Sequence, residues 1–137
     1  MKKKLISGMI SGAALLIVAA TLQSASPKKG DDVMTKENGM YVVNTTSLSK
    51  SVTGYVSATP IKIYIQKDKI VKIEALKNEE TPKYMAKVKK NLLNKWDGMK
   101  VKDAQKQTVD GVTGATFTSN AIKENVKLGL DYYKKHK

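Results

Sequence analysis

An alternation of apolar and polar residues over residues 61–75 constrains the fold more than any other stretch of the sequence. Its first part reads IKIYIQ, which gives an extended strand one apolar and one polar face. Lys67–Asp68 fits a two-residue turn. The chain then returns with three apolar residues on one face: Val71, Ile73 and Ala75. The pattern predicts an antiparallel hairpin with a core on one side only.

Two amphipathic helices are expected to cover that apolar face. Thr81–Pro82 is a good helix opening, because proline suits the first helical position. Apolar residues recur from there at helical spacing: Tyr84, Met85, Val88, Leu92 and Trp96. The first helix should end near Asp97–Gly98, where glycine supplies a cap.

The second helix is predicted after residues 110–116, from another apolar stripe: Ala121, Ile122, Val126, Leu130 and Tyr133. Its lysine-rich end suits a helix C-terminus. Short strands are expected over residues 40–43 and from Gly54 to Val56. Together these elements predict an α+β fold, in which two main helices cover one face of a small antiparallel sheet.

The N-terminal residues are typical of an export segment. Three lysines precede an uncharged run over residues 5–20, and small residues cluster at Ala19, Ala20, Ser24 and Ala25. We expect residues 1–25 to be a signal peptide or an N-terminal membrane anchor, residues 26–37 a linker, and residues 38–137 the domain. Structure should begin near Gly39. The domain is then expected outside the cytoplasmic membrane, as a periplasmic, cell-surface or secreted protein.

The composition argues against several kinds of function. The formal net charge of +13 comes from lysine alone, because the sequence has no arginine for the forked contacts that nucleic-acid readers use. There is no cysteine, and the one histidine, His136, stands next to the last residue. We therefore expect no nucleic-acid partner, no metal site and no catalytic residue set.

The segment DGVTGAT, residues 110–116, carries the functional signal. Two glycines permit a tight turn, and a predicted helix begins directly after it, so its unpaired N–H groups would favour an anion such as a phosphate. The alternative is a structural cap, in which Thr118, Ser119 or Asn120 satisfies the first turn of the helix. The spacing alone leaves both interpretations open.

This segment resembles the signature of the FMN-binding domain family, which includes the periplasmic FMN domains of the sodium-pumping NADH:quinone oxidoreductase and of the Rnf complex. The matching residues are Asp110, Thr113, Gly114, Ala115 and Thr116. Residues 38–41, 69–74 and 80–82 also resemble segments of that family, so the likeness covers roughly residues 38–134. Lys83 replaces a glycine that the family has after the third segment.

The resemblance implies FMN attached covalently through a phosphoester bond to Thr116, installed from FAD by a flavin transferase. It also implies roles for the neighbouring motif residues. Gly111, Gly114 and Ala115 leave the backbone open, Thr113 supports the turn, and Asp110 fixes the loop or is read by the transferase. Thr118 is the nearest alternative acceptor, and Glu80 and Thr81 match a family segment close to the flavin ring.

The resemblance therefore implies an exported electron-transfer flavoprotein and not an enzyme. Its partners would be the transferase, redox donor and acceptor proteins or a quinone-linked membrane complex, with residues 5–20 as a potential membrane tether. Two alternatives stay open. One is a basic secreted module that binds anionic cell-surface polymer or lipid, and the other is the same fold with non-covalent FMN.

Overall fold

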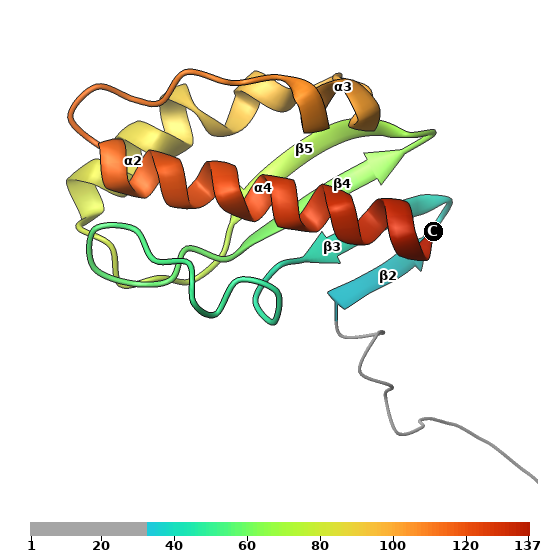
Figure 1. Ribbon diagram of the computed structural model, residues 1–137, viewed down its shortest axis with the longest axis horizontal. Coiled ribbons are helices and arrows are strands. Elements are labelled where there is room, and N and C mark those ends of the chain that lie inside the picture. Colours follow the sequence, from blue (N-terminus) through green and yellow to red (C-terminus); the bar gives the residue numbers. More distant parts are fainter. Residues whose placement is uncertain (1–32) are drawn as a thin grey trace, which may run out of the picture. The chain divides into compact units, whose positions relative to one another are not determined.

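Four antiparallel strands, in the order β2-β3-β4-β5, form the sheet in a computed structural model that describes residues 33–137 (Figure 1). The strands are β2 (Met34–Glu37), β3 (Met40–Asn44), β4 (Ile61–Gln66) and β5 (Lys69–Ala75). Helices cover one face of the sheet, which confirms the predicted α+β class. The expected export segment, residues 1–25, and residues 26–32 of the expected linker lie outside the described residues.

The predicted hairpin is confirmed, and a second one precedes it. Lys67 and Asp68 both have positive φ, 53° and 61°, as the favoured two-residue hairpin turn requires. Asn38 and Gly39 have φ of 53° and 79° and join β2 to β3 in the same way. The expectation that structure begins near Gly39 is therefore wrong, because Met34–Glu37, assigned to the linker, forms an edge strand.

One residue of the return strand faces away from the core, contrary to the predicted pattern. Ile65 pairs with Ile70 and Tyr64 pairs with Lys72, so Val71 is an extra residue in a β-bulge. The bulge turns Ile70 inward in its place and leaves Val71 44% exposed. The prediction that Val71 shares the apolar face of Ile73 and Ala75 is therefore wrong, and Ile70 takes its place.

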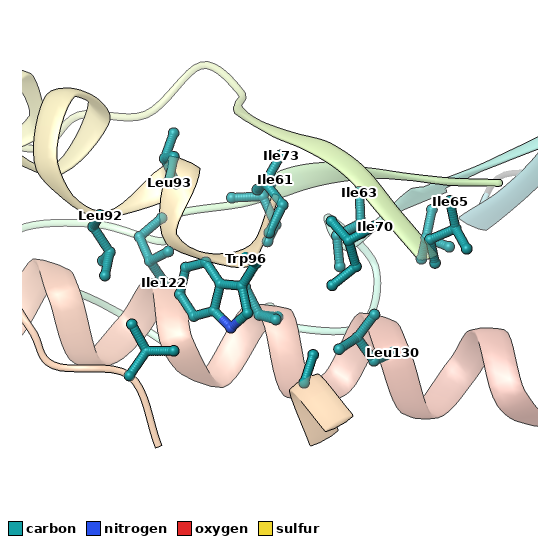
Figure 2. Packing of buried hydrophobic residues seen from close by; sticks show 14 of the residues in the cluster. Ile61, Ile63, Ile65, Ile70, Ile73, Leu92, Leu93, Trp96, Ile122 and Leu130 are labelled. Carbon is teal, nitrogen blue, oxygen red and sulfur yellow. The ribbon is translucent and has the colours of Figure 1, made fainter. Parts of the chain in front are cut away.

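The helical layer contains α2 (Pro82–Asn91), α3 (Val101–Lys106) and α4 (Thr116–His136), with a 3-10 helix, η2 (Leu93–Trp96), after α2. The predicted first helix thus ends at Asn91, and the tighter η2 that follows it packs against β5. Trp96 is buried, and Figure 2 shows its indole between the sheet and α4. The 3-10 helix buries the side chains of Leu93 and Trp96. We attribute the end of α2 at Asn91 to the packing of these two side chains. The short α3 was not expected.

Helix α4 lies against β3 and β4 and spans the length of the sheet (Figure 1). Gly129 allows this close approach, since an added Cβ would stand 2.6 Å from Ile63 Cδ1. At the same interface, the buried Thr45 hydroxyl donates to Asn125 Oδ1, and Asn125 Nδ2 donates to the Thr59 hydroxyl at 3.3 Å. These bonds fix the long β3–β4 connection to α4.

Two findings concern the described residues as a whole. Within residues 33–137 no helix is both long and apolar enough to cross a membrane. The same part of the chain holds no group of three or more acidic, histidine or cysteine residues that could bind a metal ion.

Candidate functional site

The DGVTGAT segment forms a loop that folds back onto the first turn of α4. The backbone N–H of Val112 donates to Ser119 Oγ at 3.0 Å, and that of Ala115 donates to the Val112 carbonyl at 3.0 Å. Gly114 has φ of +86°, a conformation that a residue with a side chain adopts only with strain. Gly111 lies close to Ser119, where an added Cβ would stand 3.1 Å from Ser119 Cβ.

Thr116 is the first residue of α4, and its side chain is exposed. No side chain of residues 33–137 caps this helix, and its first turn contains no acidic residue. The unsatisfied N–H groups of the first turn are therefore open to an anion beside Thr116. This arrangement agrees with the anion-binding interpretation of the segment.

The alternative interpretation, in which neighbouring side chains cap the helix, is wrong. Ser119 Oγ accepts from Val112, as described above, and the Thr118 hydroxyl donates to Glu80 Oε1 at 2.5 Å. Both residues are buried inside the first turn of α4. They fasten other segments to the helix and leave its own N–H groups uncapped.

Glu80 joins three separate segments of the chain. Besides the Thr118 hydroxyl, its carboxylate accepts three backbone N–H groups, from Tyr55 at 2.7 Å, Val56 at 2.6 Å and Ser57 at 2.7 Å. Glu80 is only 5% exposed. We call residues 54–57 together with this carboxylate the Glu80 clamp. The clamp fixes residues 54–57 as a loop beside the start of α4. The predicted strand from Gly54 to Val56 is therefore wrong.

The clamp holds Glu80 in its charged form. Burial alone would raise the pKa of its carboxyl, but the bonds from Thr118 and from the three backbone N–H groups outweigh burial and lower it. Gly54 is required for this contact, because an added Cβ would stand 2.3 Å from Glu80 Oε1 and 3.2 Å from the Cα of Thr118.

An aromatic cavity adjoins Thr116. It has a volume of about 280 Å³, and Tyr55, Tyr84 and Phe117 line it together with residues 114–116 and Thr118. The Tyr55 ring stacks on Phe117, with centroids 6.1 Å apart, and meets Tyr84 edge-on at 5.8 Å. Tyr55 and Phe117 are 60% and 65% exposed, which is unusual for such large rings and is typical of a binding surface.

Lysines surround the loop. The Lys95 ammonium donates to the Asp110 carbonyl at 3.2 Å, and Lys87 Nζ lies 3.4 Å from the point where a Gly114 Cβ would stand. Lys83, which replaces the glycine of the family, stands over the Tyr84 ring at 5.4 Å. The surroundings of Thr116 are therefore electropositive and suit a phosphate.

The structure brings most of the predicted site residues together. One cavity is lined by Gly114, Ala115, Thr116 and Thr118. Glu80 does not line it but accepts a hydrogen bond from the Thr118 hydroxyl. Thr81 is the residue before α2 and makes no capping bond with its side chain. The side chains of Asp110 and Thr113 are exposed and form no hydrogen bond within residues 33–137.

Sequence reasoning did not identify the three aromatic residues of the cavity. Phe117 gave a usable signal, because an aromatic side chain in the exposed first turn of a helix is unexpected. Tyr84 was assigned to the core by its helical spacing, and it is half-buried. Tyr55 gave no sequence signal, because its position depends on the hydrogen bond to Glu80, which lies 25 positions away in the chain.

Comparison with known families gives one match. The family model described as FMN-binding domain matches residues 54–131, more than half of the chain, and this range includes the clamp, the aromatic cavity and most of α4. Comparisons with curated proteins and with solved structures gave no match.

Proposed function

The chain belongs to the FMN-binding domain family, and we propose that it is an exported electron-transfer flavoprotein whose FMN is joined to Thr116 by a phosphoester bond. Family membership supports FMN as the cofactor and electron transfer as the role. The finer proposal rests on one observation, that the exposed Thr116 hydroxyl stands at an uncapped helix N-terminus beside an aromatic cavity.

The residues present fit the proposed linkage. The Thr116 oxygen would form a bond to the phosphorus of the FMN half of FAD while the pyrophosphate bond breaks, and AMP would leave. A threonine hydroxyl is a weak nucleophile, so the flavin transferase supplies the base that takes its proton. The exposed side chains of Asp110 and Thr113 and the glycine-containing backbone give that enzyme access to the loop.

The phosphate and the ring system would be held by different parts of the site. The uncapped N–H groups of α4 and the nearby Lys87 would neutralise the phosphate. Tyr55, Tyr84 and Phe117 would contact the planar ring, as aromatic side chains do at cofactor sites. When bound, FMN supplies one-electron and two-electron redox chemistry, while the protein supplies attachment, orientation and electrostatics.

We propose a carrier, because two of the rings that line the cavity, those of Tyr55 and Phe117, are themselves exposed to solvent. Redox donor and acceptor proteins, or a quinone-linked membrane complex, could then approach the flavin from outside. Family membership and the aromatic cavity favour this function over a purely charge-driven surface module, whose lysines would need no cavity at Thr116.

Co-expression with a flavin transferase tests the proposal. The wild-type chain should keep yellow fluorescence in a denaturing gel, and Thr116→Val, which keeps the shape of the side chain but removes its hydroxyl, should lose it. Thr108→Val, an exposed threonine outside the motif, is the matched control and should stay fluorescent. Free flavin released on denaturation of the wild type would instead show non-covalent binding.

A further inference from the structure

A lysine-rich pocket lies at the end of the domain away from Thr116. The β4–β5 turn, the start of α3 and the end of α4 line it, and they meet near the C-terminus in Figure 1. Its volume is about 270 Å³. Of the residues that the structure describes, one acidic residue, Asp68, and six lysines contribute to its lining: Lys67, Lys69, Lys100, Lys102, Lys134 and Lys137. We call these residues the basic pocket.

Most of this positive charge is uncompensated. The Asp68 carboxylate accepts the Tyr133 hydroxyl, and it also accepts Lys137 Nζ at 2.9 Å. The other five lysines form no ion pair with any residue of the described part of the chain. Like charges gathered around one concavity repel each other, and a bound anion would relieve that repulsion.

The basic pocket is too far from the aromatic cavity to act on the same ligand. Thr116 begins α4 and Lys134 stands in its last turn, so the helix rise separates them by about 27 Å. The attachment chemistry at Thr116 and the contacts of the flavin ring therefore do not account for this charge. A second partner, anionic and larger than one ion, fits it better.

We propose that the basic pocket docks the domain onto the anionic lipid headgroups of the membrane. Lysines close to such a surface are attracted to it, and their flexible side chains follow its headgroups. The start of the domain also favours this occupant. If residues 1–25 remain as an anchor, residues 26–32 can span at most about 25 Å, which keeps Val33 close to that membrane.

Docking by this end would set the orientation of the redox site. The aromatic cavity, at the opposite end of α4, would face away from the lipid and towards soluble extracytoplasmic partners. This consequence rests on the proposed function, whereas lipid binding itself requires neither FMN nor Thr116. A Thr116→Val chain should therefore bind vesicles as the wild type does, which separates a failure of this inference from a failure of the flavin assignment.

Vesicle sedimentation tests the proposal with the full chain. Partition is measured on vesicles of phosphatidylcholine alone and on vesicles of equal parts phosphatidylcholine and phosphatidylglycerol. Any apolar N-terminal contribution acts on both, so their difference isolates the charge. The triple variant Lys69→Gln, Lys102→Gln, Lys134→Gln should lose roughly fivefold per lysine in the partition coefficient for anionic vesicles, on the order of a hundredfold in all.

A matched control removes the same charge elsewhere. Lys77, Lys89 and Lys90 are exposed and lie outside the basic pocket, and their triple glutamine variant should keep most of the anionic-vesicle binding. Equal losses in the two variants would mean that only net charge matters and would overturn the proposal. Equal partition onto neutral and anionic vesicles, or binding to soluble polyphosphate without binding to anionic vesicles, would overturn it as well.

Discussion

Replacing Glu80 with glutamine should release the loop that carries Tyr55 and destabilise the fold. In the Glu80 clamp, Oε1 accepts the Tyr55 N–H and the Thr118 hydroxyl, and Oε2 accepts the N–H groups of Val56 and Ser57. A glutamine amide replaces one of these acceptors with a donor. Whichever way the amide is turned, at least one backbone N–H then faces another donor at hydrogen-bond distance.

The size of the effect follows from the number and kind of bonds lost. A hydrogen bond to a charged acceptor contributes about 1.5–3 kcal/mol, and a buried donor left unsatisfied costs about 1–3 kcal/mol. Because glutamine retains one acceptor, Glu80→Gln should lower the free energy of unfolding by about 2–4 kcal/mol. Cleavage by chymotrypsin after the exposed Tyr55 should accelerate as the loop opens.

The neighbouring Glu79 provides a control with the same change of charge. Its side chain is exposed and forms no bond within residues 33–137. Glu79→Gln should change the free energy of unfolding by no more than about 0.5 kcal/mol. Urea denaturation measures both variants. If Glu80→Gln unfolds at the same midpoint as Glu79→Gln and resists chymotrypsin equally, the clamp does not stabilise the site.

The clamp also predicts a dependence on pH. Because the folded state lowers the pKa of Glu80 below its ordinary value of 4.5, the charged carboxylate stabilises the native state above that pH. This contribution is lost as the pH falls through the lower, folded pKa. The stability difference between wild type and Glu80→Gln should therefore be constant near neutrality and shrink in acid, and a difference that stays constant into acid would contradict the assignment.

Two further predictions concern the framework. Gly54→Ala should cost about 1–3 kcal/mol and raise chymotrypsin cleavage after Tyr55, since its Cβ would displace Glu80 Oε1; wild-type urea stability would refute the close approach. Tyr133→Phe removes the hydroxyl that donates to Asp68, and this bond together with Lys137 lowers the pKa of the Asp68 carboxyl. The variant should lower the free energy of unfolding by about 0.5–1 kcal/mol at neutral pH. This is a small effect for a bond to a charged acceptor, because Asp68 is exposed. That difference should shrink as the pH falls through the folded pKa of Asp68, and a pH-independent difference measured by thermal melting would argue against it.

The sheet shows which strands a pattern can predict. The β4–β5 hairpin was predictable because its isoleucines alternate and the polar Lys67–Asp68 pair separates the two apolar runs, although positive φ is uncommon for lysine. Strand β2 was missed because it is an exposed edge strand without an apolar face, so alternation gives no signal. The Asn38–Gly39 dipeptide, a strong hairpin signal, was available and would have identified it. The bulge at Val71 depends on packing that alternation does not encode.

The site divides in a similar way. Thr116 and its loop could be nominated from the sequence, because the motif is continuous and opens a helix. The Glu80 clamp could not be predicted, because its carboxylate binds the backbone of a loop 25 positions earlier in the chain. Almost every residue type has a backbone N–H group, so the sequence does not indicate which ones act as donors. The capping role expected of Thr118 was wrong for the same reason, because its hydroxyl donates to Glu80, which lies 38 positions away in the chain.

Mass spectrometry of the transferase-treated chain tests the central claim most directly. Tryptic cleavage after Lys106 and Lys123 gives a peptide of residues 107–123, which contains the whole motif. We predict that this peptide carries one FMN phosphoester and that its fragment ions place the added mass on Thr116. Attachment at Thr113 or Thr118, or an unmodified peptide from a chain that has received active transferase and FAD, would contradict the account.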